Sequence, residues 1–260
     1  MQIEIHGTGR AAGALAVAAT RAGHTVTAVH GRTLDAVTAL EALVVVTPGT
    51  ADLRIIAVTD DAVAIVASAL SDEPFTPTVH VSGALPVSAL GPLGCGPVGS
   101  FHPLQALPDA RTGADRLAGS WIAVTAAEPF ASTLDAFAES IGGRPFRLAD
   151  ADKAVYHAAA VAAGNFTVAA LGVAERLLTE AGVPFEAAAP LVAGVVANAF
   201  ELGPGAALTG PIARGDAGTV ARQLAAIAEV SDEVLEMFLA MARATALYAG
   251  AGEAMDEVLR

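Results

Sequence analysis

The chain has 260 residues, more than half of them hydrophobic, and a single cysteine, Cys95. This length suffices for one large domain or two modest ones with a sizeable core, and a lone cysteine excludes an internal disulfide. The formal net charge of −13 argues against nucleic-acid and anionic-membrane partners, because neither supplies a counter-charge. The first ten residues show no signal-peptide pattern, and we find no strongly apolar run of about 18 residues without polar groups. We therefore expect a cytoplasmic protein without a membrane partner.

Short apolar strands alternate with helical segments over the first half of the chain. The predicted strands are residues 2–6, 25–30, 42–46, 54–59, 78–82, 96–100 and 120–125. The predicted helices among them are residues 11–22, 62–70 and 130–141. Strands that alternate with helices are typical of βαβ units and indicate a mostly parallel sheet.

From about Asp150 onward the strand signals stop and the pattern is helical. The predicted helical stretches are residues 152–181, 185–202, 216–229 and 231–258. We predict an α/β fold: an N-terminal Rossmann-type, doubly wound domain over residues 1–149, followed by an all-α domain over residues 150–260. The alanine-rich helices expose more apolar surface than one small domain can cover, so we also expect a homodimer formed through this second domain.

The segment "IEIHGTGRAAGAL" carries a glycine-rich turn between a strand and a helix. Gly7 and Gly9 take the first two positions of G-x-G-x-x-G/A and Ala12 takes the third, so we predict dinucleotide binding. The free N–H groups at the start of the helix would face the phosphates, which places Thr8, Arg10 and Ala11 at the cofactor as well. The alternative is a plain tight turn.

The end of the second strand indicates which dinucleotide is bound. NAD sites usually place Asp or Glu there, but this chain reads Ala-Val-His-Gly-Arg over residues 28–32. Arg32 is placed to pair with a 2′-phosphate, and Arg10 is placed to assist. We predict NADP as the cofactor and no metal; the alternative for Arg32 is a solvated side chain on a turn.

Polar residues also follow the next strands, at the edge of the sheet where ligands bind. Thr59 and Asp60 are predicted beside the cofactor ribose, although Asp60 and its neighbour Asp61 also suit a helix cap. Ser82 and Gly83 are small enough for the nicotinamide to lie close. His80 is interpreted as a packed core histidine.

The stretch "GSFHPLQ" places Ser100, His102 and Gln105 just after another strand. Ser100 and His102 are candidate substrate-binding residues, with a simple strand-ending turn as the alternative.

Lys153 is the only lysine beside thirteen arginines, and His157 follows it four residues later on the same helix face. A partly desolvated lysine has a lowered pKa and can give a proton to a carbonyl oxygen, so we predict Lys153 and His157 as catalytic residues. Asn165 lies about 18 Å further along the helix axis, so it cannot touch the same substrate atom as Lys153. It is predicted to line a different part of the substrate cleft or the dimer contact. The alternative for Lys153 is an ordinary exposed lysine.

The segment "LTGPIARGDAGTV" contains two further candidates. Arg214 on a loop between helices would match a substrate carboxylate. Asp216 is a second substrate-binding candidate, and it also suits the cap of the next helix together with Thr219.

Taken together, "GTGRAAGAL", "AVTDDAV", "HVSGA", "GSFHPLQ", "DKAVYHAAAVAAGNF" and "LTGPIARGD" resemble the Rossmann-like proteins whose helical C-terminal domain is catalogued as DUF2520. The resemblance extends over essentially the whole chain. It implies an architecture similar to that of ketopantoate reductases, β-hydroxyacid dehydrogenases and pyrroline-5-carboxylate reductases, with a helical domain like the C-terminal one of 6-phosphogluconate dehydrogenase. Some family members are understood to be an alternative type of ketopantoate reductase.

The resemblance departs from those dehydrogenases at one position. They carry an asparagine four residues after the catalytic lysine, where this chain has His157, so the group that holds the substrate differs. The "GSFHPLQ" stretch is also similar to the GSHP stretch of prephenate dehydrogenases, which suggests a substrate with a carboxylate.

We therefore predict an NADPH-dependent reductase of a small 2-keto acid, with ketopantoate as the first substrate to test. Lys153 would protonate the alkoxide, His157 would orient the substrate and Arg214 would anchor its carboxylate. One alternative is a reductase of C=N bonds, as in pyrroline-5-carboxylate reduction. Another is a redox sensor that binds NADPH without turnover.

Overall fold

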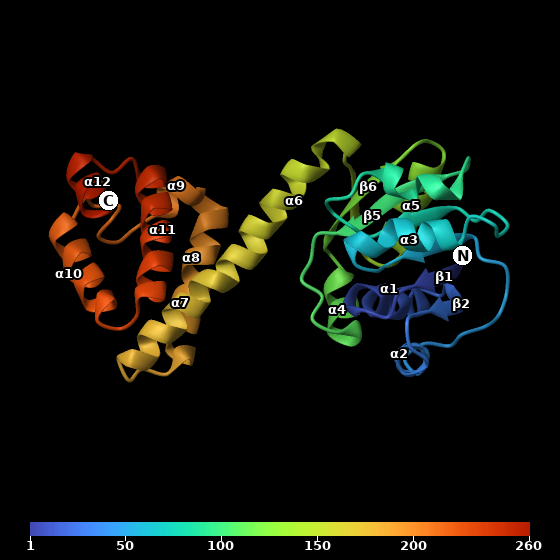
Figure 1. Ribbon diagram of the computed structural model, residues 1–260, viewed down its shortest axis with the longest axis horizontal. Coiled ribbons are helices and arrows are strands. Elements are labelled where there is room, and N and C mark those ends of the chain that lie inside the picture. The colour runs from blue at the N-terminus through green and yellow to red at the C-terminus, as the bar shows by residue number, and fades with distance from the viewer. The chain divides into compact units, whose positions relative to one another are not determined.

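A computed structural model describes all 260 residues, which divide into two compact units. The first unit spans Met1–Ala162 and contains every strand, and the second spans Ala163–Arg260 and is entirely helical (Figure 1). The structure thus has the predicted fold class, a Rossmann-type sheet domain followed by a helical domain. The division falls after Ala162, whereas the sequence prediction placed it at residue 150, so the helix that carries Lys153 lies in the first unit.

The first unit is built on one seven-stranded sheet with the order β2-β1-β3-β4-β5-β6-β7. The strands are β1 (Gln2–His6), β2 (Thr25–His30), β3 (Leu53–Ile56), β4 (Thr78–His80), β5 (Val98–Pro103), β6 (Trp121–Ala126) and β7 (Arg144–Arg147). All neighbours pair in parallel except β5 and β6. β1 has β2 on one side and β3 on the other, so the strand order reverses there. Ligands of open parallel sheets bind beyond the carboxyl ends of the strands at such a reversal.

Helices cover both faces of this sheet (Figure 1). They are α1 (Arg10–Arg21), α2 (Leu34–Glu41), α3 (Asp60–Ala69), the 3-10 helix η1 (Val87–Leu93), α4 (Ala110–Leu117) and α5 (Phe130–Ser140). α1 is buried along almost its whole length, and a Cβ added at its Gly13 would lie 2.7 Å from the Cβ of Ala110 on α4. The absence of a side chain at Gly13 therefore lets the two helices pack closely.

The first unit ends with a turn of 3-10 helix, η2 (Asp150–Asp152), and helix α6 (Lys153–Val161). A π-helical turn, η3 (Ala162–Phe166), joins α6 to α7 of the second unit. The remaining elements of the second unit are α7 (Thr167–Glu180), η4 (Phe185–Ala188), α8 (Ala189–Leu202), α9 (Pro204–Ala207), α10 (Ala217–Ala228), α11 (Asp232–Ala249) and α12 (Glu253–Val258). Its core forms where α7, α10, α11 and α12 pack together.

Several predicted elements differ from the structure. Residues 42–46 are not a strand: only Val46 forms a single bridge, to Val26, although the run of valines favours extended structure. The predicted helix over residues 231–258 is two helices, because Gly250 takes a left-handed conformation and ends α11. The helices α2 and α4 and the strand β7 were not predicted.

Two helical segments are long and apolar enough to cross a membrane, contrary to the sequence-based expectation. They are Asp150–Glu180, with mean hydropathy 1.4, and Phe185–Leu202, with mean hydropathy 1.3. Hardly any of either apolar stretch is buried within the chain. The length and composition of two helices are weak evidence for a membrane. Their low burial shows that a large apolar surface lies exposed.

Candidate active site

A groove of about 1290 Å³ lies at the carboxyl ends of the central strands. It is lined by the ends of β1, β2 and β3, by residues of α3 and by the segment that follows β5. The predicted cofactor residues that line it are Gly7, Thr8, Gly9, Arg10, Ala11, Arg32 and Thr59. The structure therefore brings most of the predicted cofactor site together in one cavity.

The glycine turn begins the groove. Gly7 has φ +127°, and a Cβ there would lie 2.1 Å from the carbonyl oxygen of Ala57, so only glycine fits between β1 and β3. Gly9 has open space where a Cβ would stand, and it precedes α1 without any side-chain cap. The N–H groups at the start of α1 are thus free to bind an anion. Ala12 is fully buried and packs the helix on the sheet, in agreement with the small third position of the motif.

Three further predicted cofactor residues, Asp60, Ser82 and Gly83, are not among the residues that line the groove. Asp60 begins α3, and Thr59 is the residue before that helix. Ser82 is buried, and its hydroxyl accepts hydrogen bonds from the N–H groups of Ala84 and Leu85, which orders the turn around Gly83.

Lys153 is buried, with 1% of its surface exposed. Its Nζ donates to the hydroxyl of Ser100 at 2.6 Å and to the carbonyl of Ser82 at 3.4 Å, so it ties α6 to the middle of β5 and to the turn that follows β4. Burial lowers the pKa of Lys153, while the charges of Asp150 and Asp60 partly oppose that shift. The alternative of an exposed lysine is therefore wrong.

His102 and His157 flank Gly83 next to this lysine. A Cβ at Gly83 would lie 2.8 Å from His102 Nε2 and 2.8 Å from His157 Cδ2, so a side chain there would displace both rings. His102 also lines the groove. Its Nδ1 is 2.7 Å from the hydroxyl of Tyr156 on α6, a contact that the sequence analysis did not identify.

Burial sets the protonation of this group. It lowers the pKa of His102 to about 4, with help from His157 and Lys153, and raises that of Tyr156 to about 12. At neutral pH His102 is therefore uncharged and Tyr156 keeps its proton. If the Tyr156 hydroxyl donates to Nδ1, His102 Nε2 carries a proton toward Gly83 and can donate a hydrogen bond.

His80 is the last residue of β4, and its interpretation as a packed core histidine is confirmed. It is fully buried, its Nδ1 accepts from the N–H of Ser82 at 3.2 Å, and its Nε2 has no hydrogen-bond partner. Burial, followed by the charge of Lys153, lowers its pKa to about 4, so the ring is neutral.

The other candidate substrate residues lie in the second unit and are not among the residues that line the groove. Asn165 is exposed on the π-helical turn. Arg214 is exposed on a loop before α10. Asp216 caps α10 by accepting from the N–H of Thr219 at 3.0 Å, which accounts for it structurally.

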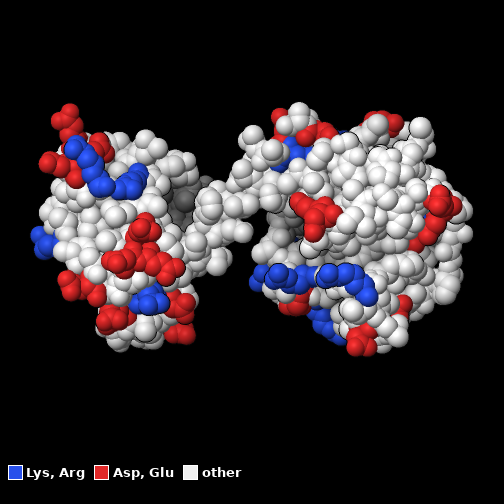
Figure 2. All heavy atoms as spheres, viewed as in Figure 1, with Lys and Arg blue, Asp and Glu red and all other residues white.

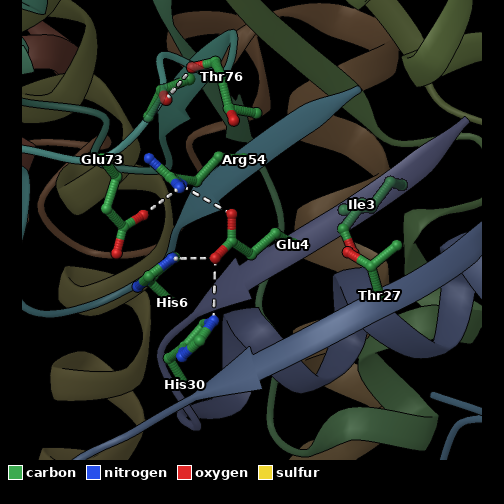
Figure 3. Close-up of polar contacts among 9 residues, drawn as sticks. Ile3, Glu4, His6, Thr27, His30, Arg54, Glu73 and Thr76 are labelled. Atoms are coloured by element: carbon green, nitrogen blue, oxygen red, sulfur yellow. Dashed lines mark hydrogen bonds and ion pairs between the residues drawn. The ribbon is translucent and has the colours of Figure 1, made fainter. Parts of the chain in front are cut away.

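A cluster of charged residues at the edge of the groove was missed (Figure 3). Glu4 of β1 lies 3.1 Å from His6 Nε2, 2.9 Å from His30 Nε2 and 2.8 Å from Arg54 Nε, and Arg54 Nη2 donates to Glu73 at 2.7 Å. Burial alone would raise the pKa of Glu4, but the contacts with His30, His6 and Arg54 outweigh it and hold that pKa well below the ordinary range. The only sequence signal for this cluster is the spacing of Glu4 and His6, which places both on one face of β1.

Glu4, His6 and His30 also bring one donor atom each within 4.8 Å, as metal ligands do. However, the two imidazole rings are stacked, with centroids 4.3 Å apart and planes only 16° from parallel. Both Nε2 atoms already lie against one carboxylate oxygen of Glu4, Oε1, and Arg54 occupies the other oxygen. The arrangement fits an ion-pair cluster.

Comparison with known proteins supports the resemblance that the sequence suggested. Residues 120–245 match the model of a family described as "Domain of unknown function (DUF2520)". Among solved structures, "putative NADP oxidoreductase BF3122" from Bacteroides fragilis is similar, with 24% identity, TM-score 0.83 and coverage of 95% of this chain and 98% of that chain. Protein TM1727 from Thermotoga maritima shares 22% identity with TM-score 0.70, over 94% of this chain and 98% of that one.

A reductase has the same fold over the full length. The 1-pyrroline-5-carboxylate reductase of Streptococcus pyogenes matches at 17% identity and TM-score 0.64, over 100% of this chain and 96% of that chain. No curated protein matches the sequence. At these identities the similarity shows the fold that the chain shares with these proteins.

Proposed function

We propose that the chain is an NADPH-dependent reductase of a small 2-keto acid, and that ketopantoate is the first substrate to test. The observation that carries this proposal is Lys153, a buried lysine anchored to Ser100 of β5 and to the carbonyl of Ser82, whose neighbours Val81 and His102 line the dinucleotide-type groove. A proton donor held next to a glycine-turn cofactor site is what the reduction of a carbonyl requires. The structures named above, which include an NADP oxidoreductase by description, support the same class of reaction.

The groove fits a dinucleotide phosphate. The open backbone at Gly9 and the uncapped start of α1 offer N–H donors for the pyrophosphate. Arg10 and Arg32 line the same groove and provide positive charge for a 2′-phosphate, which favours NADP over NAD. When bound, NADPH supplies the hydride.

The residues of this chain hold the substrate and supply the proton. Lys153 Nζ carries the proton and Ser100 accepts its hydrogen bond, so the proton reaches the forming alkoxide from Nζ directly or through the Ser100 hydroxyl, which regains it from Nζ. His102 and His157, on either side of Gly83, orient the carbonyl. Arg214 and Asn165 remain proposed substrate residues from the second unit.

A second candidate function is the reduction of a C=N bond. The fold extends over the full length of the pyrroline-5-carboxylate reductase and also of an imine reductase from Streptomyces aurantiacus, with TM-score 0.65 and 18% identity. The two reactions differ in their need for the lysine, because an iminium ion accepts hydride without a further proton donor.

Both functions are tested by following NADPH consumption with ketopantoate and, in parallel, with cyclic imines. We expect turnover with the keto acid and formation of the corresponding hydroxy acid. Turnover with cyclic imines alone would replace the first function by the second. Tight NADPH binding without turnover of any substrate would favour the redox sensor.

We also propose that the chain is a soluble homodimer joined through its second unit. Large apolar side chains are exposed on η3, α7 and α8. They are Phe166, Val168, Leu191, Val195, Val196, Phe200 and Leu202. The face drawn in Figure 2 carries its charged side chains in small separate groups and leaves wide uncharged areas between them. The first turns of the long apolar helix hold Lys153 in the sheet unit, so a second copy is a better partner for this surface than lipid.

A further inference from the structure

The ion-pair cluster of Glu4, His6, His30, Arg54 and Glu73 joins β1, β2, β3 and the segment after α3 (Figure 3). His6, His30 and Glu73 line the groove themselves. The end of β2 is where a Rossmann-type site distinguishes the 2′ substituent of the adenine ribose, usually with an acidic residue. Here that position is His30, and the acid, Glu4, stands behind it on the neighbouring strand.

The ring of His30 is fixed by two contacts. Its Nε2 is held 2.9 Å from the carboxylate of Glu4, and its face stacks on His6. The side chain is nevertheless 49% exposed and belongs to the groove lining. Nδ1 has no hydrogen-bond partner in the chain, so it is the atom that remains for a ligand.

The charges around His30 favour its protonated form. Contact with Glu4 raises the pKa of His30 against the effect of burial, Glu73 raises it further, and Arg54 lowers it. Two other cations, Arg10 and Arg32, line the same groove. The ring therefore keeps its proton to a higher pH than an ordinary histidine does.

The two forms of the ring suit different ligands. With Nε2–H directed at Glu4, a neutral ring presents a lone pair at Nδ1, which accepts a hydrogen bond from a ribose 2′-hydroxyl. A protonated ring presents Nδ1–H and a positive charge, which donate a charge-assisted hydrogen bond to a 2′-phosphate. An acidic residue at this position would accept from the hydroxyl and repel the phosphate at any neutral pH.

We propose that His30 is a specificity-determining residue whose protonation selects the cofactor, so that the preference for NADPH over NADH increases as the pH falls. The proposal rests on the dinucleotide binding proposed above. Binding of the 2′-phosphate is coupled to uptake of one proton by His30, whereas binding of NADH is not.

The test measures the dissociation constants of NADPH and NADH by titration calorimetry from about pH 5 to about pH 8, at constant ionic strength, for wild type and His30→Gln. The 2′-phosphate has its own pKa of about 6, so part of any pH dependence comes from the ligand. The His30→Gln protein measures that part alone, because it keeps Arg10 and Arg32 and lacks the titrating ring. His24→Gln is the matched control, since His24 lies at the opposite end of β2, where its ring contacts the N-terminus and Ser140.

We expect the affinity ratio of NADPH to NADH in wild type to rise about tenfold as the pH falls through the pKa of His30, as one unit of pKa coupling predicts. The His30→Gln protein should lose that rise and His24→Gln should keep it. Parallel pH profiles of wild type and His30→Gln would overturn the proposal and leave the reductase function standing. Absence of binding of both dinucleotides in wild type would overturn the two together.

A second measurement needs no variant. In an NMR pH titration of wild type, the probe 2′,5′-ADP should raise the pKa of the His30 ring, and 5′-AMP should not. Equal pKa values with the two probes would overturn the proposal.

Discussion

The environment of Lys153 is unfavourable for a charged side chain, unlike that of a surface lysine. It is almost fully buried, it bonds to one hydroxyl and one carbonyl, and no carboxylate lies within ion-pair distance. Burial therefore lowers its pKa, and Asp150 and Asp60 only partly oppose that shift. A residue that served stability alone would be replaced at little cost by an apolar side chain.

The pH dependence of turnover follows from this shift. The protonated lysine is the proton donor, so kcat should fall as the pH rises through its pKa, and the fall should occur below the pH expected for an ordinary lysine. The measurement is a pH–rate profile under saturating NADPH and substrate. A profile that is flat up to the ordinary lysine pKa would contradict the assignment of Lys153 as the acid.

Arg54 is the residue on which the ion-pair cluster depends most. Its side chain is 5% exposed and it neutralises Glu4, which is 14% exposed, whereas its other partner, Glu73, is half exposed. Arg54→Leu should lower the free energy of unfolding by about 3 kcal/mol, because it leaves a partly buried carboxylate without its guanidinium partner. Glu73→Gln is the control and should cost no more than about 1 kcal/mol.

Acid unfolding reports on the same pair. The pKa of Glu4 is depressed in the folded protein, so its stabilising contribution is present above the ordinary carboxyl pKa and is lost as the pH falls through the acid range. In Arg54→Leu this acid-dependent loss should shrink. Equal stability of Arg54→Leu and Glu73→Gln in denaturant melts would show that the cluster is not coupled as described.

At the scale of elements, the turn between β4 and η1 positions the two histidines. A Cβ at Gly83 in this turn would meet His102 and His157, whereas a Cβ at Gly91 in η1 would have no other atom within 4 Å. Gly83→Ala should reduce kcat about 10²-fold by displacing both rings, since a small misplacement of positioning groups has effects of that size. Gly91→Ala is the matched control, and unchanged turnover in both variants would remove His102 and His157 from the site.

The sequence predicted those elements whose signals are local. β1 and β2 have the predicted bounds, and the glycine turn lies where the spacing of Gly7 and Gly9 placed it. β7 was missed because its four residues, RPFR, carry a proline and no alternation, which a strand at the edge of a sheet tolerates. α4 was missed because its composition is polar and contains Gly113, although Asp109 caps it.

In the candidate site, too, the sequence predicted individual residues with local signals but not the contacts between distant segments. Lys153 and Ser100 were identified separately, each from its own segment, but their 2.6 Å contact depends on how α6 packs on β5. The cluster around Glu4 was not predictable, because its members come from β1, β2, β3 and the segment after α3. Asp216 was assigned to substrate although a cap explained it fully, and the structure shows the cap.

At the scale of the whole molecule, the exposed apolar face of the second unit is the surface through which the proposed dimer would form. Phe200 on α8 is 90% exposed, so its replacement removes no core contact. Phe200→Asp should shift the protein from dimer to monomer in light scattering at micromolar concentration without changing its thermal unfolding as a monomer. Leu34→Asp on α2, 79% exposed in the first unit, is the control and should remain dimeric. A monomeric wild type would contradict the dimer.

The central claim is that the buried lysine is the proton donor of an NADPH-dependent reductase. The most direct test compares NADPH consumption with ketopantoate by wild type and Lys153→Met, with NADPH affinity measured on both proteins. Methionine fills a similar volume without a proton, so we predict a loss of turnover of about 10²–10⁴-fold at unchanged NADPH affinity. Full turnover by Lys153→Met would contradict the account, and failure of wild type to bind NADPH would contradict it at the level of the cofactor.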